Sequence, residues 1–391
     1  MKLRRLNPED FITMENNMNI AFCIERSAPP EDKYDEYLYC YGAFTDEGKM
    51  TSSVVANPYR CTYWGQSVGM CGVGGVATFP EYRREGHMRH LMPYVLKAAY
   101  DRGDVLSALF PFSHPFYRKF GFECCGPVQT CSAGLPAFRD VPVTGRVRQV
   151  MPGEDYAEIR AVYAAYQREH NFLCDRDADY WTRLLGEDPY VTHRHTYLWY
   201  DEDGRAQAYC LLRHVQSGGQ KDYEVIDWAY VSPAALRGLF GLFRLLTPSG
   251  RDVRFKLPAD ADLFSLIPDP YDIHIRLENC GMLRVINAEK ALKLHPWREE
   301  LKGFTVRVND PDIEENCRMF RVECGGETRV TADDGAEPDL EVSIQALSRL
   351  LCGACTLSSA LWHREDVRAK NPTAALLAAF EENAMLLIEP F

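Results

Sequence analysis

Two arginines and a glycine stand where an apolar, strand-like segment gives way to a helix-like one. The run GVGGVATFP at residues 72–80 predicts a strand that ends at a proline, and Arg83, Arg84 and Gly86 follow it. The first N–H groups of a helix have no partner within the helix, so a helix start can bind an anion. Arginines add charge-assisted bonds to phosphate, and glycine leaves room for the ligand. This chemistry predicts a pyrophosphate site.

The two common phosphate-binding fingerprints do not describe this site. The sequence after the strand contains neither G-x-x-x-x-G-K-[ST] nor G-x-G-x-x-G. An ordinary strand-to-helix turn with surface arginines is therefore the alternative. The next segment has an apolar stripe at helical spacing, formed by Met88, Leu91, Met92, Val95, Leu96 and Ala99. Pro93 lies within it, which predicts either a kink or a regular helix that begins near this residue.

A second stretch, HPFYRKFGF at residues 114–122, adds to the first. Together they resemble the GNAT superfamily of acetyl-CoA-dependent N-acetyltransferases. The family's phosphate loop is R/Q-x-x-G-x-G/A, and this chain has methionine in place of the last small residue: Arg83-Arg84-Glu85-Gly86-His87-Met88. The family element F-Y-x-K-x-G-F matches at Phe116, Tyr117, Lys119, Gly121 and Phe122.

The resemblance implies a complete set of coenzyme contacts. It assigns them to the strand end, the loop with the helix start, and one later serine: Val76, Ala77, Thr78, Arg83, Arg84, Glu85, Gly86, His87, Met88, Arg89 and Ser113. It makes Tyr117 the general acid for the leaving thiolate, and a phenol pKa near 10 suits a thiol. A core tyrosine is the alternative. His114, three residues earlier in the chain, is a candidate substrate-binding residue.

The elements that would position these residues occur twice along the chain. Each copy runs helix, hairpin, strand, Pro turn and helix, with the helices expected at 7–22 and from 151, the hairpins at 37–55 and 196–212, and the strands ending at Pro80 and Pro233. Two related α/β domains are therefore expected. The second copy has only Arg237-Gly238, without an arginine pair or a second F-Y-x-K-x-G-F, so we expect no second coenzyme site.

The last hundred or so residues have a different pattern. Strands are predicted at 304–310 and 319–326, helices at 339–353 and 371–383, and an apolar, buried tail at 384–391. With two GNAT-like halves before it, this arrangement resembles the Eis (enhanced intracellular survival) acetyltransferases, whose third domain is similar to sterol carrier proteins. The resemblance implies an α/β (α+β) fold with two GNAT-like domains in tandem, at 1–145 and 146–288, and a sterol-carrier-protein-like domain at 289–391.

The end of the chain acquires a role through the same resemblance. In the Eis family the free carboxylate of the last residue reaches the active site as general base, and here that residue is Phe391. A terminal carboxylate has a pKa of about 3.5, so it would orient an ammonium group and relay a proton through water. Glu389 is a second candidate there, with a surface glutamate as the alternative.

Charge narrows the substrate class. The net charge is −12, from 56 acidic and 44 basic residues, which argues against a general nucleic-acid binder and suits a cationic substrate. The segment 24–37 carries Glu25, Glu31, Asp32, Asp35 and Glu36, and the matching region of the family borders the amine pocket. An aminoglycoside, a polyamine or a lysine side chain would fit, while a solvated polar loop is the alternative.

Other classes of site find little support. The 14 cysteines form no framework, and the C-x-x-C at Cys352 and Cys355 has no second pair, so we expect free thiols and no metal. Without a signal-like N-terminus or an apolar run long enough to span a membrane, the resemblance implies a cytoplasmic bacterial protein. It also implies a homo-oligomer, hexameric in the family.

Two rival functions remain at this point. The apolar run LSRLLCGACTLSSALW at 347–362 and the sterol-carrier resemblance suggest a carrier of a lipid or another hydrophobic ligand, although such a run is usually core. A scaffold that binds coenzyme without turning it over is the other possibility. The arginine pair and Tyr117 favour the enzyme, a transferase that acetylates an amine by direct transfer from acetyl-CoA.

Overall fold

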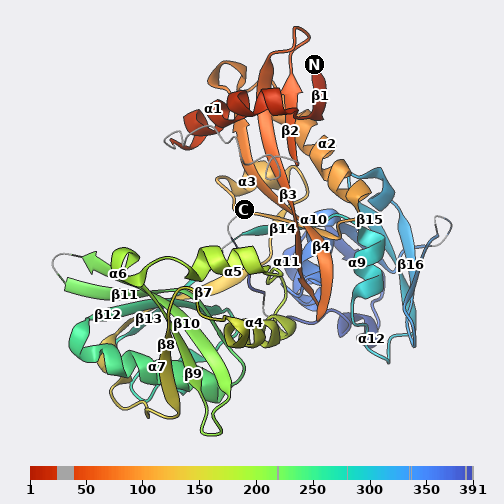
Figure 1. The fold of residues 1–391 in the computed structure, drawn as a ribbon. Coiled ribbons are helices and arrows are strands. Elements are labelled where there is room, and N and C mark those ends of the chain that lie inside the picture. Colours follow the sequence, from red (N-terminus) through yellow and green to blue (C-terminus); the bar gives the residue numbers. More distant parts are fainter. Residues whose placement is uncertain are drawn as a thin grey trace. The chain divides into compact units, whose positions relative to one another are not determined.

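A computed structural model describes residues 1–23, 39–217, 220–279, 281–333, 335, 337–383 and 385–389. The chain folds into two compact units (Figure 1). Unit 1 comprises Met1–Gly126, Cys280–Asn383 and Leu387–Phe391, and unit 2 comprises Pro127–Asn279 and Ala384–Leu386. The class is mixed α/β, as expected, and each unit has its own sheets and core.

The first sheet of unit 1 has seven strands in the order β1-β2-β3-β4-β5-β14-β6. Their bounds are Lys2–Arg5, Cys40–Phe44, Met50–Tyr63, Gln66–Thr78, Leu106–Leu109, Met282–Val285 and Glu123–Cys124, respectively. The accompanying helices are α1 (Phe11–Phe22), α2 (His87–Arg102) and α3 (His114–Arg118), with short 3-10 turns η1 (Pro8–Asp10) and η3 (Pro80–Tyr82).

The two long helices cover opposite faces of this sheet (Figure 1). Side chains alternate across a strand, so β2 directs Cys40 and Phe44 to a cluster with Phe11 and Met14 of α1. The neighbours on β2, Tyr41 and Ala43, join the larger core under α2, which holds all six residues of the predicted apolar stripe. The helix α2 begins at His87, so Pro93 lies inside a continuous helix and does not mark its beginning.

One strand of this sheet comes from a distant part of the chain. Strand β14 follows unit 2 in sequence, yet it pairs antiparallel with β5 and with β6, through Met282 opposite Leu109 and Cys124. A matching exchange occurs in unit 2, where β7 (Pro127–Gly134) lies between β12 and β13. Each unit therefore contains one strand that adjoins the other unit in the sequence: β14 follows the last strand of unit 2 but belongs to unit 1, and β7 follows β6 of unit 1 but belongs to unit 2.

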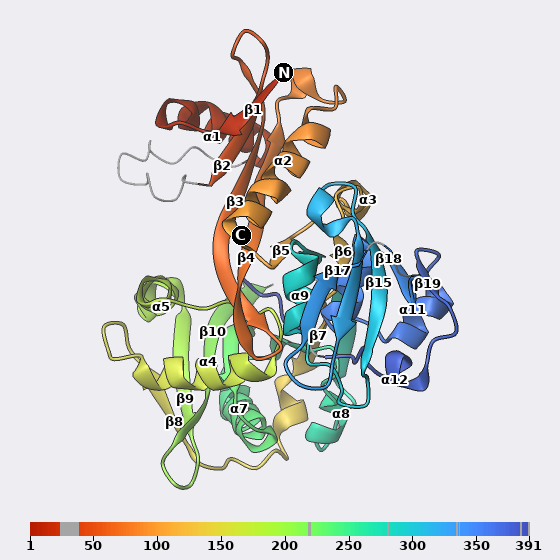
Figure 2. The ribbon, with the colours of Figure 1, turned by 90° about the vertical axis from the view of Figure 1, so that its right-hand side faces the viewer.

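A second sheet completes unit 1 (Figure 2). It has five strands in the order β17-β16-β15-β18-β19, with bounds Arg329–Ala332, Met319–Glu323, Gly303–Asn309, Leu340–Ser343 and Val367–Ala369. Its helices are α9 (Ala288–Leu294), α10 (Ile344–Leu351), α11 (Leu357–His363) and α12 (Ala374–Leu377), with the 3-10 turn η6 (Glu314–Asn316). The hairpin β3–β4 packs into this part of unit 1, where the Tyr63 hydroxyl donates to the Ala291 carbonyl at 3.2 Å.

Two predicted helices are shorter in the structure. The segment expected as a helix over 339–353 starts with β18 and becomes helical only at Ile344, where the Ser343 side chain caps α10. The helix expected over 371–383 is the single turn of α12, because the chain then turns to pack Phe380 against Trp297 and Phe304.

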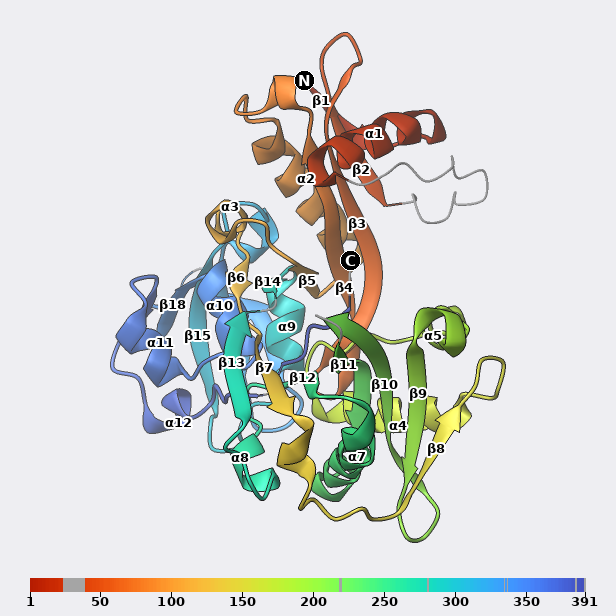
Figure 3. The ribbon, with the colours of Figure 1, turned by 90° about the vertical axis from the view of Figure 1, so that its left-hand side faces the viewer.

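Unit 2 repeats the architecture of the first sheet (Figure 3). Its strand order is β13-β7-β12-β11-β10-β9-β8, with β8–β13 at Arg146–Val150, Arg194–Tyr200, Ala206–Ser217, Gln220–Tyr230, Asp252–Pro258 and Ile273–Asn279. The helical segments are α4 (Ala157–Glu169), α5 (Ala178–Leu185), α6 (Pro189–Thr192), α7 (Pro233–Leu246) and α8 (Leu263–Leu266), with η4 (Leu135–Phe138) and η5 (Thr247–Ser249). Both predicted hairpins, β2–β3 and β9–β10, are present. None of the helices within the described ranges is long and apolar enough to cross a membrane.

Candidate functional site

Strand β4 continues beyond the part that pairs with β5. Its parallel pairing with β5 covers Met70–Gly72 opposite Leu106–Ala108, whereas the strand itself continues to Thr78. A bulge on the other side, between Ser53 and Val55 of β3, accompanies Gly75 at a φ of +54°. The β5-facing edge of Val76–Thr78 can therefore pair with an extended ligand that carries amide groups.

The loop after β4 brings backbone and arginine side chains to the start of α2. Arg84 and Gly86 have positive φ values of +69° and +87°, and Gly86 is the N-cap of the helix. A β-carbon on Gly86 would meet nothing within 4 Å, so the space beside it is open. Arg83, Arg84 and Arg89 are exposed. A helix start with an unobstructed cap and three arginines suits a polyanion.

The remaining predicted loop residues have contacts of their own. The Nε2 atom of His87 lies 3.1 Å from a Glu85 carboxylate oxygen, and its ring packs edge-on against Tyr82. Arg83 donates from Nε to the Thr78 carbonyl at 3.1 Å, which ties the loop to the end of β4. The Met88 side chain is buried in the core under α2, so only its backbone can face a ligand.

Tyr117 lies on α3, a short helix within an aromatic cluster. Its side chain is 3% exposed, and its ring contacts those of Phe112, Phe116 and Phe122 at centroid distances of 5.3, 5.0 and 6.2 Å. Burial raises the pKa of Tyr117 above the ordinary value for a phenol. The hydroxyl therefore keeps its proton at neutral and moderately alkaline pH.

The structure brings the predicted groups around one core. Tyr117 and Met88 belong to the same buried cluster, and Val76 packs against it. Ser113 is the N-cap of α3, and its carbonyl accepts from the Tyr117 backbone N–H at 3.3 Å. His114, half-buried, begins the helix. The strand end, the loop and the tyrosine are thus fixed to a common apolar support.

The corresponding turn in unit 2 is built differently. Strand β11 ends at Tyr230 and α7 begins at Pro233, so no loop like Arg83–Gly86 separates them. The Ser232 side chain caps α7 by accepting from the Ala235 N–H at 3.1 Å. A β-carbon on Gly238 would lie 2.2 Å from the Trp199 ring, so this glycine serves helix packing.

The chain end is described up to residue 389. Met385, Leu386 and Leu387 are buried, as the apolar pattern predicts, and Glu389 is 2% exposed. Within unit 1, Leu387 lies close to Gly281, and a β-carbon on that glycine would lie 3.2 Å from the Leu109 carbonyl at the end of β5. Phe391 lies outside the described residues, and so do the acidic side chains of 24–37.

Sequence reasoning missed one charged residue beside the site, Arg284 of β14. Its side chain is fully buried, pairs with Asp310, and donates to the Phe120 carbonyl just after α3. The available signal was an arginine within the apolar run Met282–Ile286. In the part of the chain that is described, no group of three or more His, Cys, Asp or Glu side chains is arranged to hold a metal ion.

Three protein families match successive parts of the chain. An acetyltransferase (GNAT) domain matches residues 2–125, another acetyltransferase (GNAT) domain matches 173–285, and a sterol carrier protein domain matches 288–386. An uncharacterized N-acetyltransferase of Streptomyces griseus is 28% identical over 318 residues, which cover 74% of this chain and 73% of the relative.

Solved structures show the same fold over the whole chain. A probable N-acyltransferase from Enterococcus faecalis superimposes with a TM-score of 0.88 at 22% identity, covering 100% of this chain and 99% of that one. Eis1 from Mycobacterium abscessus superimposes with a TM-score of 0.83 at 19% identity, covering both chains fully. The chain is therefore an N-acetyltransferase of the GNAT superfamily, with two GNAT domains followed by a sterol carrier protein domain, and it shares its fold with Eis1.

Proposed function

We propose that the chain transfers the acetyl group of acetyl-CoA directly to an amine of a cationic substrate, with Tyr117 as general acid and the terminal carboxylate of Phe391 as general base. The observation that carries this proposal is the geometry of β4. Its edge at Val76–Thr78 is free of β5, and the strand leads into the arginine loop at the start of α2. An edge that can pair with amides, followed by a polyanion site, is complementary to the pantetheine arm and the pyrophosphate of the coenzyme.

The proposed residues divide the binding work by chemistry. Arg83, Arg84 and Arg89, with the backbone from Glu85 to Met88, would hold the pyrophosphate. Val76 and Thr78 would pair with the pantetheine amides, Ala77 would contact the coenzyme between them, and a backbone N–H near Val76 would stabilise the oxyanion. Ser113 would contact the coenzyme at the start of α3. Unit 2 lacks such a loop, which supports a single coenzyme site per chain.

The proposed reaction uses two proton transfers. The neutral amine nitrogen attacks the thioester carbonyl carbon, and a bond forms between them. Collapse of the tetrahedral intermediate breaks the carbon–sulfur bond, and the Tyr117 hydroxyl gives its proton to the leaving thiolate. The proton lost by the amine passes to the Phe391 carboxylate, directly or through water. Solvent then returns a proton to the tyrosinate and takes one from the carboxyl group.

The substrate class follows from charge. The net charge of −12 favours encounter with cations, so we propose an aminoglycoside, a polyamine or a lysine side chain as acceptor. His114, at the start of α3, is the proposed contact to this substrate. A homo-oligomer is proposed on the family resemblance alone.

The test is release of free thiol from acetyl-CoA with kanamycin, spermidine and a lysine peptide. The native chain is compared with a folded variant extended by two glycines after Phe391. We expect turnover by the native chain and little by the extended one, because the extension moves the carboxylate. Equal turnover by both would keep the transferase and remove Phe391 as base.

The carrier alternative is less well supported. The apolar run that suggested it forms α10 and α11, where Leu347, Leu350 and Leu351 are fully buried. The indole N–H of Trp64, at the tip of the β3–β4 hairpin, donates to the Leu351 carbonyl at 2.8 Å. These helices therefore act as core. Uptake of a fluorescent fatty acid without any thiol release would reverse this preference.

A further inference from the structure

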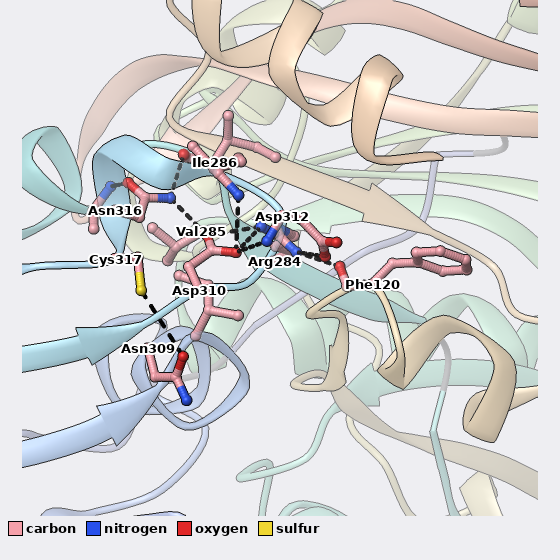
Figure 4. A network of polar contacts seen from close by, with 12 residues as sticks. Phe120, Arg284, Val285, Ile286, Asn309, Asp310, Asp312, Asn316 and Cys317 are labelled. Carbon is pink, nitrogen blue, oxygen red and sulfur yellow. Dashed lines mark hydrogen bonds and ion pairs between the residues drawn. The ribbon is translucent and has the colours of Figure 1, made fainter. Parts of the chain in front are cut away.

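Arg284 is a charged residue in a position that normally holds an apolar one. It lies in the middle of β14, and its side chain is 0% exposed. Its Nη2 atom donates to both carboxylate oxygens of Asp310, at 2.6 and 2.7 Å, and its Nη1 atom donates to Asp312 at 3.0 Å (Figure 4). A buried charge is tolerated only when it is paired and hydrogen-bonded. Both acids follow β15, in the sterol carrier protein domain.

The same guanidinium reaches the backbone that follows Tyr117. Nη1 of Arg284 donates to the Phe120 carbonyl, as Figure 4 shows. The N–H of Phe120 in turn donates to the Tyr117 carbonyl at 2.9 Å, and the N–H of Phe122 donates to it at 3.4 Å. A single residue therefore stands between the buried guanidinium and the backbone of the proposed general acid.

The contact between Arg284 and the Phe120 carbonyl leaves no room for a side chain at residue 121. Its φ is +77°, and a β-carbon on it would lie 2.1 Å from Nη1 of Arg284. Two features therefore require the glycine of the F-Y-x-K-x-G-F element. Its backbone is left-handed, and a side chain there would overlap the Arg284 guanidinium. This links a local motif to a residue that lies far along the chain.

Further contacts hold the same segment from the sterol carrier protein domain. From α10, Gln345 donates to the Arg118 carbonyl at 2.9 Å, and Arg349 donates to the Cys124 carbonyl. Arg364, just after α11, lies 3.3 Å from the Glu123 carboxylate. The backbone on the C-terminal side of Tyr117 is therefore fixed by side chains of that domain.

We propose that Arg284 is a positioning residue for Tyr117, and that the sterol carrier protein domain takes part in catalysis by holding Arg284 through Asp310 and Asp312. The inference rests on the general-acid role in the proposed function. Because its side chain is fully buried, Arg284 is not proposed to contact coenzyme or substrate. It fixes the Phe120–Gly121 turn, which fixes the orientation of α3 and of the phenol.

The direct test is Arg284→Lys. A lysine has one charged atom, so it cannot bridge Asp310 and the Phe120 carbonyl as the planar guanidinium does. Misplacement of the acid should lower kcat about tenfold to a hundredfold. The KM for acetyl-CoA should stay within about twofold, because the arginine loop is not part of this network, and uniform binding is unaffected. Activity is followed as thiol release with the most active amine of the panel above.

A matched control separates positioning from general weakening. Arg176 of unit 2 is also buried and donates to both oxygens of Asp227, at 2.7 and 3.2 Å. Arg176→Lys should change stability without lowering kcat specifically. Where Arg284→Lys does not fold, Asp312→Asn replaces it, because the Asp312 side chain is 11% exposed and accepts from Nη1 alone among the arginine nitrogens.

The decisive readout is the double mutant with Tyr117→Phe. If Arg284 acts through the phenol, Arg284→Lys should lower kcat no further in the Tyr117→Phe background. Three results would overturn the positioning inference and leave the general acid in place. They are kcat losses that multiply in the double mutant, a rise in KM as large as the fall in kcat, and an unchanged kcat in Arg284→Lys. An undiminished kcat in Tyr117→Phe would overturn the general acid, and the positioning inference with it.

The inference also has a readout that needs no turnover. Should the wild-type chain release no thiol with any amine, the proposed function fails and amide hydrogen exchange decides the structural claim. Faster exchange across residues 114–122 in Arg284→Lys, with α2 unchanged, would support the inference. Unchanged exchange there would overturn it.

Discussion

Tyr117 is surrounded by aromatic rings that set its acid strength. Phe112, Phe116 and Phe122 enclose the ring, and burial raises the pKa of the Tyr117 phenol above 10. A general acid must carry its proton when the thiolate leaves. Because the pKa is raised, the protonated form persists to higher pH than it would in an exposed tyrosine.

We therefore predict the pH dependence and the size of the Tyr117 effect together. Tyr117→Phe should lower kcat by about 10²-fold or more, the typical contribution of a general acid, with little change in the KM for acetyl-CoA. In the wild-type chain kcat should not decline on the alkaline side below about pH 10, because the phenol stays protonated there. Steady-state thiol release between pH 6 and pH 10 measures both quantities.

A second tyrosine of the same core provides the control. Tyr100, on α2, packs against the cluster that contains Tyr117. Tyr100→Phe should leave kcat within about twofold, because it removes a hydroxyl without removing the proposed proton donor. An alkaline loss of kcat centred well below pH 10 that disappears in Tyr117→Phe would contradict the raised pKa.

At single positions, the sequence led to candidate site residues only where a local motif contained them. The F-Y-x-K-x-G-F element pointed to Tyr117 and Gly121, and the strand–proline–arginine pattern pointed to Arg83 and Gly86. The reason for Gly121 was not predictable, because its neighbour Arg284 arrives through strand pairing between distant segments. A lone arginine among apolar residues is a usable signal that a buried acid must lie nearby.

At the scale of elements, strand β4, the loop that contains Arg83 and helix α2 together form the proposed coenzyme site. The pattern predicted a strand ending near Pro80 and a helix with an apolar stripe, and both are present as β4 and α2. It did not predict the 3-10 turn Pro80–Tyr82 or the left-handed Arg84. Such details depend on contacts such as Arg83 with the Thr78 carbonyl, which no local pattern encodes.

Removing the charge of the two loop arginines should weaken the binding of acetyl-CoA. Arg83→Gln with Arg84→Gln should raise the KM for acetyl-CoA about tenfold or more, since hydrogen bonds to charged groups contribute about 1.5–3 kcal/mol each. The kcat at saturating coenzyme should change little, because Tyr117 is untouched. Initial rates over a range of acetyl-CoA concentrations, repeated at higher salt, measure the effect.

Unit 2 supplies the matched variant. Arg237 stands near the start of α7, where the second copy has a capped helix and no loop. Arg237→Gln should leave the KM for acetyl-CoA unchanged. An unchanged KM in the double Arg83/Arg84 variant would remove the pyrophosphate assignment.

At the scale of the whole molecule, the exchange of β7 and β14 shows where sequence reasoning stops. The helix–hairpin–strand repeat revealed two related halves, and both are present. The exchanged strands were not foreseen, because a short strand has the same local pattern in either sheet. Their partners are set by tertiary pairing, such as Met282 with Leu109 and Ile273 with Ala133.

Unit 1 also contains a buried histidine where its two sheets are joined. His295 is 3% exposed and lies among Trp64, Trp297 and Phe380, with ring centroids 5.1, 4.3 and 6.0 Å away. Burial lowers the pKa of His295 to about 4, against weak opposition from the Ala379 and Leu351 carbonyls and from Glu381. The folded chain thus holds this imidazole neutral.

The sign of the linkage predicts acid sensitivity of unit 1. Above pH 6.5 both folded and unfolded chains keep His295 neutral, and below it the unfolded chain binds a proton that the folded chain excludes until about pH 4. Lowering the pH from 7.5 to 5.0 should therefore cost about 2 kcal/mol of stability through this residue. Calorimetric unfolding of the wild-type chain and His295→Gln at both pH values measures this loss of stability.

The His295→Gln chain should lose less stability on acidification, whereas His363→Gln, at an exposed position on α11, should behave as the wild type does. Equal losses in all three chains would mean that His295 is not the residue that makes the joined sheets acid-sensitive.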